Sequence, residues 1–187
     1  HVKPLLDKLN LFLEMLVFDN VAAIFKKLSK KLELPYQTTA TNCLAGKDLT
    51  LLADIEEYFP TSCLPTNYHY IGPLTWKSTA GAPSWWPPNK IADHFAYFTM
   101  GTTWMGGGVE ELCRLIFSHG LSAVVSTGGQ FESIASVREK YHEKSIYLED
   151  FVDGDMVMEV ADVVVCHGGN GTIYQALLHG KPIVGIP

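Results

Sequence analysis

The chain has 187 residues, of which 47% are hydrophobic and 18% are charged, a globular composition that excludes an intrinsically disordered protein. The formal net charge of −6 argues against a protein that coats nucleic acid or an anionic membrane, although backbone dipoles can still hold a phosphate locally. The four cysteines are scattered, without a C-x-x-C pair, which favours small, buried free thiols in a reducing compartment over disulfides or a zinc site.

The N-terminal part, residues 1 to about 59, begins with apolar residues at helical spacing. The basic run Lys26–Lys31 falls toward the end of the predicted helix, where cations are stabilising. No run reaches the roughly 18 uncharged apolar residues that a membrane span requires, and the start lacks the basic-then-apolar pattern of a signal peptide. We therefore expect a mostly helical segment here and no transmembrane segment.

Residues 60 to about 94 contain six prolines and two glycines, a density typical of an irregular connection. The segment also carries Trp76, Trp85 and Trp86, more aromatic surface than a solvated linker retains. We expect the segment to pack against a domain. The alternative, in which Trp85 and Trp86 line an acceptor cleft, is the less favoured interpretation.

From Phe95 onward, short apolar strands alternate with amphipathic helices. The predicted strands lie at 96–100, 122–126, 145–148, 163–166 and 183–186, and the predicted helices at 109–119, 131–142 and 172–179. This alternation predicts parallel β-α-β units with right-handed crossovers. A parallel sheet has both faces covered, and nothing follows the last strand, so we expect the sequence to be part of a longer protein.

Glycine and hydroxyl residues follow four of these strands, at 101–103, 127–130, 149–154 and 167–172. Ligands of open parallel sheets bind outside the carboxyl ends of the strands, so we expect these loops to converge on one edge. In the loop 167–172, glycines permit close backbone approach, and the following helix start carries about half a positive charge. This pattern predicts a site for a diphosphate without lysine or metal.

A second interpretation of the same loop is a tight strand-to-helix turn in which His167 caps a neighbouring carbonyl group. The loop matches neither G-x-G-x-x-G nor G-x-x-x-x-G-K-[ST], which argues against dinucleotide-dependent dehydrogenases and P-loop NTPases. Taken alone, the loop leaves the two interpretations open.

The segment Ala161–Pro187 closely resembles the donor-site signature of UDP-glycosyltransferases of the GT-B fold, most closely that of the bacterial macrolide-type and sterol-type enzymes. Three further segments fall in family order. Tyr68–Leu74 resembles the exit from the acceptor domain, Tyr97–Thr103 resembles the first strand and loop of the donor domain, and Phe151–Val157 resembles the nucleobase segment.

The resemblance implies an α/β fold, with the Rossmann-like parallel sheet of a GT-B donor domain preceded by a mostly helical piece of the acceptor domain. It divides the chain into the C-terminal part of the acceptor domain at 1–75, an interdomain linker at 76–94 and a truncated nucleotide-sugar donor-binding domain at 95–187.

The resemblance also implies roles for individual residues. The residues expected to bind the donor are Thr102, Phe151, Val152, His167, Asn170, Gly171, Thr172 and Gln175. His167, Thr102 and the helix start at 170–172 would contact the diphosphate, whereas Phe151 and the Val152 backbone would contact uracil. Gln175 stands where many members have a glutamate for the ribose hydroxyls, and Asp153 replaces a common proline.

The implied activity is that of a UDP-dependent hexosyltransferase, which moves a sugar to a hydroxyl group of a small lipophilic acceptor without a metal or other cofactor. The general base of the family, a histidine in an early acceptor-domain loop, has no match here, and the sugar-holding acidic-amide pair would follow residue 187. We therefore expect no catalytic residue in this chain and no activity from the chain alone.

The expected partners are a UDP-sugar and the acceptor, and not nucleic acid. The expected location is the cytoplasm, with peripheral membrane contact allowed. Two alternatives stay open. One is a lipid-linked N-acetylglucosaminyl transferase or a sugar-nucleotide epimerase of the same fold, and the other is a non-catalytic nucleotide-binding module.

Overall fold

A computed structural model describes residues 3–34, 46, 48–75, 81–88, 94–101, 108–129 and 134–186. The chain forms two compact units, His1–Gly72 and Pro73–Pro187. The boundary lies inside Tyr68–Leu74, the segment that resembles the exit from an acceptor domain.

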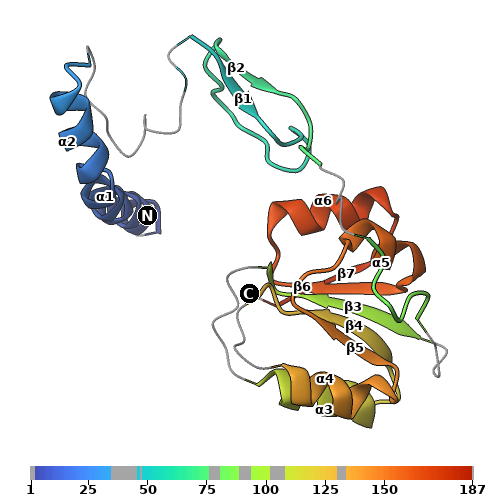
Figure 1. Ribbon diagram of the computed structural model, residues 1–187. Helices are drawn as coiled ribbons and strands as arrows, with labels where there is room; N and C mark the ends of the chain where they lie inside the picture. Colours follow the sequence, from blue (N-terminus) through green and yellow to red (C-terminus); the bar gives the residue numbers. More distant parts are fainter. Residues whose placement is uncertain are drawn as a thin grey trace. The chain divides into compact units, whose positions relative to one another are not determined.

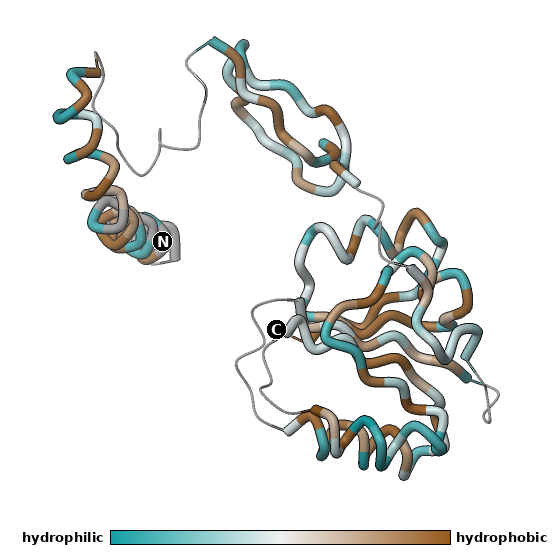
Figure 2. Tube along the Cα trace, in the orientation of Figure 1, coloured by the Kyte–Doolittle hydropathy of each residue, from teal (hydrophilic) through white to brown (hydrophobic). Residues whose placement is uncertain are grey.

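The first unit begins with two helices, α1 (Lys3–Val21) and α2 (Ala23–Lys31), separated at Ala22. The sequence pattern predicts one long helix, whereas the structure divides it into two. Both helices carry exposed large apolar side chains, among them Phe12, Phe18 and Ile24. The tube in Figure 2 shows hydrophobic and hydrophilic residues mixed along these helices. No helix among the described residues is both long and apolar enough to cross a membrane.

Two short strands follow in the same unit, β1 (Thr50–Leu52) and β2 (Tyr68–Tyr70). They pair in parallel, with Thr50 opposite Tyr68. The sequence analysis does not predict these strands, because three residues are too few to show a period. Within the described part of residues 1–75, helix is confined to α1 and α2.

The second unit is built on a five-stranded parallel sheet in the order β5-β4-β3-β6-β7 (Figure 1). Its strands are β3 (Phe95–Thr99), β4 (Ser122–Ser126), β5 (Ile146–Glu149), β6 (Val163–Cys166) and β7 (Ile183–Gly185). All five predicted strands are confirmed to within one residue at each end, because each is a short apolar run bounded by turn residues.

Helices cover both faces of this sheet (Figure 1). One face is covered by α3 (Val109–Ser118) and α4 (Ala135–His142), and the other by α5 (Gly154–Val160) and α6 (Asn170–Leu178). The three predicted helices are confirmed, although the predicted start of α4 at residues 131–133 lies outside the described residues. The seven-residue α5 is not predicted by the sequence analysis.

Alternate residues of the strands form two apolar cores. On β4, Ala123 and Val125 belong to the core beneath α3 and α4, whereas Val124 belongs to the core on the opposite face. Both faces of the central strands are therefore buried, which explains why the sequence of these strands is continuously apolar and does not alternate with polar residues.

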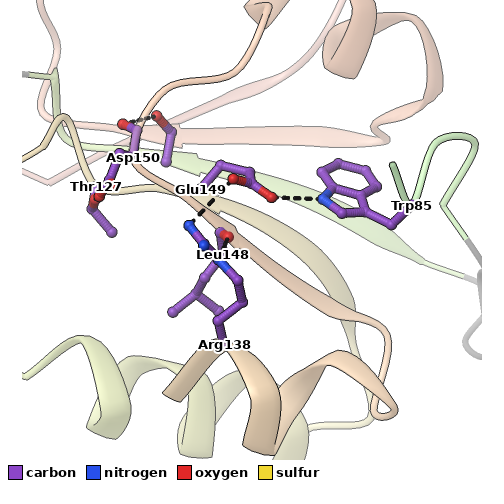
Figure 3. Close-up of polar contacts among 7 residues, drawn as sticks. Trp85, Thr127, Arg138, Leu148, Glu149 and Asp150 are labelled. Atoms are coloured by element: carbon purple, nitrogen blue, oxygen red, sulfur yellow. Dashed lines mark hydrogen bonds and ion pairs between the residues drawn. The ribbon is translucent and has the colours of Figure 1, made fainter. Parts of the chain in front are cut away.

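On the α5–α6 face, the proline-rich segment supplies part of the cover over β5. The Trp85 ring stacks on Tyr147, with ring centroids 4.4 Å apart and an interplanar angle of 24°. Trp85 Nε1 also donates a hydrogen bond of 2.7 Å to Glu149 Oε1 (Figure 3). The packing interpretation is confirmed for the described residues 81–88, since Trp85 and Trp86 both pack against this core.

Removing the Trp85 side chain should destabilise the second unit. We expect Trp85→Ala to lower the free energy of unfolding by about 2–4 kcal/mol, because a large, partly buried ring is lost. Trp85→Phe keeps the stacking but loses the hydrogen bond to Glu149, and should cost about 1 kcal/mol. Urea unfolding measures both values, with Leu178→Ala on the exposed surface of α6 as a control. Equal urea midpoints for the parent and both Trp85 variants would show that the packing of Trp85 on β5 does not stabilise the second unit.

Candidate functional site

The candidate site lies where the sheet changes its winding direction. The chain passes from β3 to β4 on one side and from β6 to β7 on the other, while β3 and β6 are direct neighbours. Ligands of open α/β sheets bind at such a switch point, outside the carboxyl ends of the strands. Gly101 follows β3 and His167 follows β6. A Cβ atom at Gly101 would lie 2.8 Å from His167 Cε1, so these loops meet at one edge, as predicted.

A cleft of about 320 Å³ opens at this edge. Its lining residues are Leu74, Thr75, Tyr97, Thr99, Gly101, Ser126, Gly128, Phe151, Val152, Asp153, Gly154, Gly171, Thr172 and Gln175. Five of the residues expected at a donor site are therefore brought together here: Phe151, Val152, Gly171, Thr172 and Gln175. His167 and Asn170 stand beside the cleft without lining it, and Thr102 lies outside the described residues.

The N-terminus of α6 forms one wall of the cleft. The helix begins at Asn170, two residues after Gly168, whose φ of +86° favours glycine. The N-cap residue Gly169 has no side chain with which to cap the first turn, so that turn depends on other partners for its N–H groups. Lys and Arg are absent from the described residues that line the cleft. Positive potential in this wall therefore comes from the helix dipole.

His167 is held between two glycines. A Cβ atom at Gly169 would lie 2.6 Å from His167 Nε2, and one at Gly101 would lie 2.8 Å from His167 Cε1. His167 Nδ1 is buried, and no described residue forms a hydrogen bond with it. Buried polar atoms nearly always have a partner, so this nitrogen leaves a hydrogen-bonding requirement unmet by the described chain. Among the described residues, Nδ1 caps no carbonyl group.

The loop after β5 forms the opposite wall. Phe151 is 69% exposed, and its ring lies against Gly129, where a Cβ atom would be 3.0 Å from Phe151 Cε2. Such an exposed aromatic face beside a cleft is available for stacking. Asp153 caps α5, since its carboxylate accepts a hydrogen bond of 3.0 Å from the Asp155 N–H. This cap accounts for the residue that replaces the common proline of the family.

Gln175 joins the two helices at the cleft. Its Oε1 atom would lie 2.7 Å from a Cβ atom at Gly154, so the amide lies directly against the start of α5. Gln175 therefore projects from α6 into the cleft wall, where it is partly buried and keeps both donor and acceptor atoms.

Tyr97 is a lining residue that the sequence analysis misses. Burial raises the pKa of Tyr97 to about 12, and the nearby Asp153 charge adds to this, whereas hydrogen bonds with Thr99 and Ser126 act in the opposite direction. The three hydroxyl groups thus form a polar cluster at the carboxyl ends of β3 and β4. Tyr97 and Thr99 stand two residues apart on one face of β3, which is the only signal in the sequence for this cluster.

Within the described part of the chain, no three His, Cys, Asp or Glu side chains gather as metal ligands would. Cys113 and Cys166 are free and buried, and Cys63 is free and exposed. The expectation of free thiols is confirmed for these three cysteines, whereas burial is wrong for Cys63.

Residues 111–187 match the family model of the glycosyltransferase family 28 C-terminal domain. The chain carries a glycosyltransferase family 28 C-terminal domain. This match includes β4 to β7, the loop after β5 and the start of α6, and therefore the greater part of the cleft lining. The predicted membership of a glycosyltransferase family is confirmed.

Curated proteins similar to this chain are named glycosyltransferases. A PGL/p-HBAD biosynthesis rhamnosyltransferase of Mycobacterium bovis is 29% identical over 139 residues, 74% of this chain and 30% of the relative. A PGL/p-HBAD biosynthesis glycosyltransferase of Mycobacterium tuberculosis is 30% identical over 144 residues, 75% of this chain and 31% of the relative. The chain thus spans about a third of the length of these relatives.

Solved structures support the fold of the chain. The glycotransferase of kitacinnamycin superposes with a TM-score of 0.61 at 18% identity, over 88% of this chain and 42% of that protein. The glycosyltransferase SnogD from Streptomyces nogalater gives a TM-score of 0.55 at 20% identity, over 74% of this chain and 38% of that protein. The predicted α/β fold with the parallel sheet of a GT-B glycosyltransferase is confirmed.

The raised pKa of Tyr97 predicts a loss of stability in alkali. The folded protein holds the Tyr97 proton more tightly than the unfolded chain, whose tyrosines titrate near 10.0. The contribution is present below that pH and is lost as the pH rises toward 12, by on the order of 2–3 kcal/mol. We expect the parent to lose this stability relative to Tyr97→Phe in urea unfolding between about pH 9 and about pH 12. A parent–variant difference that stays constant over this range contradicts the assignment.

Proposed function

We propose that this chain forms the donor-binding part of a glycosyltransferase that takes a sugar from a UDP-sugar and passes it to a hydroxyl group of a small lipophilic acceptor. The observation that carries the proposal is the start of α6, which enters the cleft at the switch point with an uncapped first turn and with His167 beside it. A family 28 domain over the same residues supports it.

In this proposal, the diphosphate binds at the start of α6. Backbone N–H groups of Asn170, Gly171 and Thr172, together with the Thr172 hydroxyl, donate to its oxygens, and His167 adds a ring donor. These groups are fixed before the reaction, so they stabilise the negative charge that develops as UDP leaves, without reorganisation. No metal or other cofactor is needed for this stabilisation.

The nucleoside binds toward the loop after β5. Phe151 stacks on the base, the Val152 backbone binds the base edge, and Gln175 binds the ribose hydroxyls. The position of these residues around one cleft supports the assignment. The cleft volume of about 320 Å³ lies at the lower end of the range usual for small-molecule sites.

The nucleophile half of the reaction belongs to the part of the relatives that this chain does not cover. A general base there would deprotonate the acceptor hydroxyl, and we propose that the chain by itself transfers no sugar at a useful rate, since losing such a base costs about 10²–10⁴-fold. We place the whole protein in the cytoplasm, with its lipophilic acceptor reached in solution or at a membrane surface.

A non-catalytic nucleotide-binding module is the second candidate. It is favoured by one observation: a Mycobacterium bovis relative named an inactive PGL/p-HBAD biosynthesis glycosyltransferase is 38% identical over 71 residues, 38% of this chain and 18% of the relative. Both candidates require the same nucleotide site. Only transfer by the full-length protein, measured with donor and acceptor together, separates them.

Nucleotide binding tests the site directly. Calorimetry of the chain with UDP, dTDP, GDP and ADP should give the tightest binding for UDP, because the base and ribose contacts are specific. Binding should be unchanged in EDTA, since no cation takes part. Tighter binding of another nucleoside diphosphate would correct the donor, and loss of binding in EDTA would overturn the metal-free site. Binding of none of the four would remove the proposal.

His167 is the side chain on which diphosphate binding should depend most. Hydrogen bonds to charged groups contribute about 1.5–3 kcal/mol, so His167→Ala should weaken UDP binding roughly 10- to 150-fold. Uridine, which lacks the diphosphate, should bind the parent and the variant equally. Calorimetry with both ligands measures the difference, and a thermal melt shows whether the fold survives.

The matched control is His179→Ala. His179 lies at the other end of α6, where its Nε2 atom is 2.9 Å from Asp155 Oδ1. This variant loses a hydrogen bond at the far end of the same helix and should keep its UDP affinity. If His167→Ala keeps UDP affinity and melts many degrees lower, His167 has a structural role only.

A further inference from the structure

The loop after β5 is bonded closely to the loop after β4. The Thr127 N–H donates to the Glu149 carbonyl oxygen at 2.9 Å, and the Gly128 N–H donates to the Asp150 carbonyl oxygen at 2.8 Å. The side chains add a third bond, in which the Thr127 hydroxyl donates to Asp150 Oδ1 at 3.0 Å (Figure 3). Thr127 is fully buried, so its hydroxyl group cannot form a hydrogen bond with bulk water instead.

Asp150 directly precedes the residues that would hold the base. Phe151 is mostly exposed, so burial does not fix its position. The position of Phe151 must instead be fixed by the preceding residue, Asp150, and by the contact of the Phe151 ring with Gly129. Thr127 connects these two points, because it bonds to Asp150 and begins the turn that contains Gly129.

The other side of the same loop is fixed by the preceding residue. Glu149 accepts a hydrogen bond from Trp85 Nε1 and forms an ion pair of 3.3 Å with Arg138 Nη2. Arg138 Nε also donates a hydrogen bond of 2.7 Å to the Leu148 carbonyl oxygen. Figure 3 shows that Glu149 and Asp150 thus reach different elements of the domain. With Glu149 held in this way, two side-chain hydrogen bonds hold the next residue of the loop: the Thr127 hydroxyl donates to the Asp150 carboxylate at 3.0 Å, and the Ser126 hydroxyl donates more weakly to the Asp150 carbonyl oxygen at 3.4 Å. The Thr127–Asp150 bond is the shorter of the two and the one that involves the Asp150 side chain.

We propose that Thr127 and Asp150 are positioning residues for nucleotide binding, because their hydrogen bond holds the Phe151–Val152 loop in the conformation that receives the base. This inference rests on the proposed function. Neither side chain needs to touch the nucleotide. A loop that is already ordered before the ligand binds loses less conformational entropy on binding, and this increases the affinity.

Threonine and aspartate suit this role for a chemical reason. A bond from a hydroxyl to a carboxylate is shorter and stronger than one between neutral groups. Thr127→Val keeps the shape of the side chain but leaves the Asp150 carboxylate without that donor. The free energy of the carboxylate is then lower if it moves toward water, and this movement displaces the start of the base-binding loop.

The test separates the base from the diphosphate. The full chain is titrated with uridine and with inorganic pyrophosphate, following each by NMR. Thr127→Val should weaken uridine binding about 3- to 10-fold, a part of what a charge-assisted bond contributes, and leave pyrophosphate binding unchanged. Thr127→Ser keeps the donor and should restore uridine binding. Ser118→Ala is the control, because it removes a hydroxyl that donates to the Leu115 carbonyl oxygen at the far end of α3.

A double-mutant cycle shows whether the two residues act as one unit. Thr127→Val combined with Asp150→Ala should bind uridine no more weakly than Asp150→Ala alone. Additive losses, or equal weakening of uridine and pyrophosphate, overturn the positioning role, since a general loosening of the fold affects both ligands. Unchanged uridine binding in Thr127→Val overturns it too, while the proposed function stands. A parent that binds neither uridine nor UDP overturns both.

Discussion

The parallel pairing of β3 with β6 is the contact on which the candidate site depends. It places Thr99 opposite Cys166, and therefore brings the loops that follow these residues together. Both faces of the sheet are packed, so a slip of one residue would turn Tyr97 and its neighbours toward the wrong core. The position of His167 against Gly101 is thus set by burial along the whole strand and not by local contacts alone.

Around this pairing, the cleft is built with little side-chain charge. Its positive potential comes from the start of α6, while the acidic residues nearby have structural partners. Asp153 caps α5, Asp150 binds Thr127, and Glu149 binds Trp85 and Arg138. Of these three carboxylates only Glu149 has a cationic partner, Arg138, whereas the donors to Asp150 and Asp153 are neutral groups that hold the side chains in place without offsetting their charge. Helix capping and anion binding therefore coexist at one edge of the sheet.

The sequence predicts most of the second unit, because short apolar strands and glycine-rich loops leave strong patterns. The cleft residues of α6 and of the loop after β5 are predicted by the resemblance to a glycosyltransferase family and not by these patterns. The sequence does not predict α5, since seven residues started by a cap show little periodicity, nor Tyr97, which reads as an ordinary core residue of a strand. The Thr127–Asp150 bond joins two loops 23 residues apart, and no local pattern reveals such a contact.

The stacking of Trp85 on Tyr147 has a consequence for the order in which the domain assembles. Trp85 and Glu149, the residue to which its ring donates a hydrogen bond, are 64 residues apart along the chain. Tyr147 and Glu149 both belong to β5, which pairs in the sheet only with β4. Closing so long a loop is entropically costly until β3, β4 and β5 are paired. The proline-rich segment therefore docks late in folding. In the native state it is the part that can detach by local opening while every strand stays paired, and amide hydrogens beneath it exchange by that route.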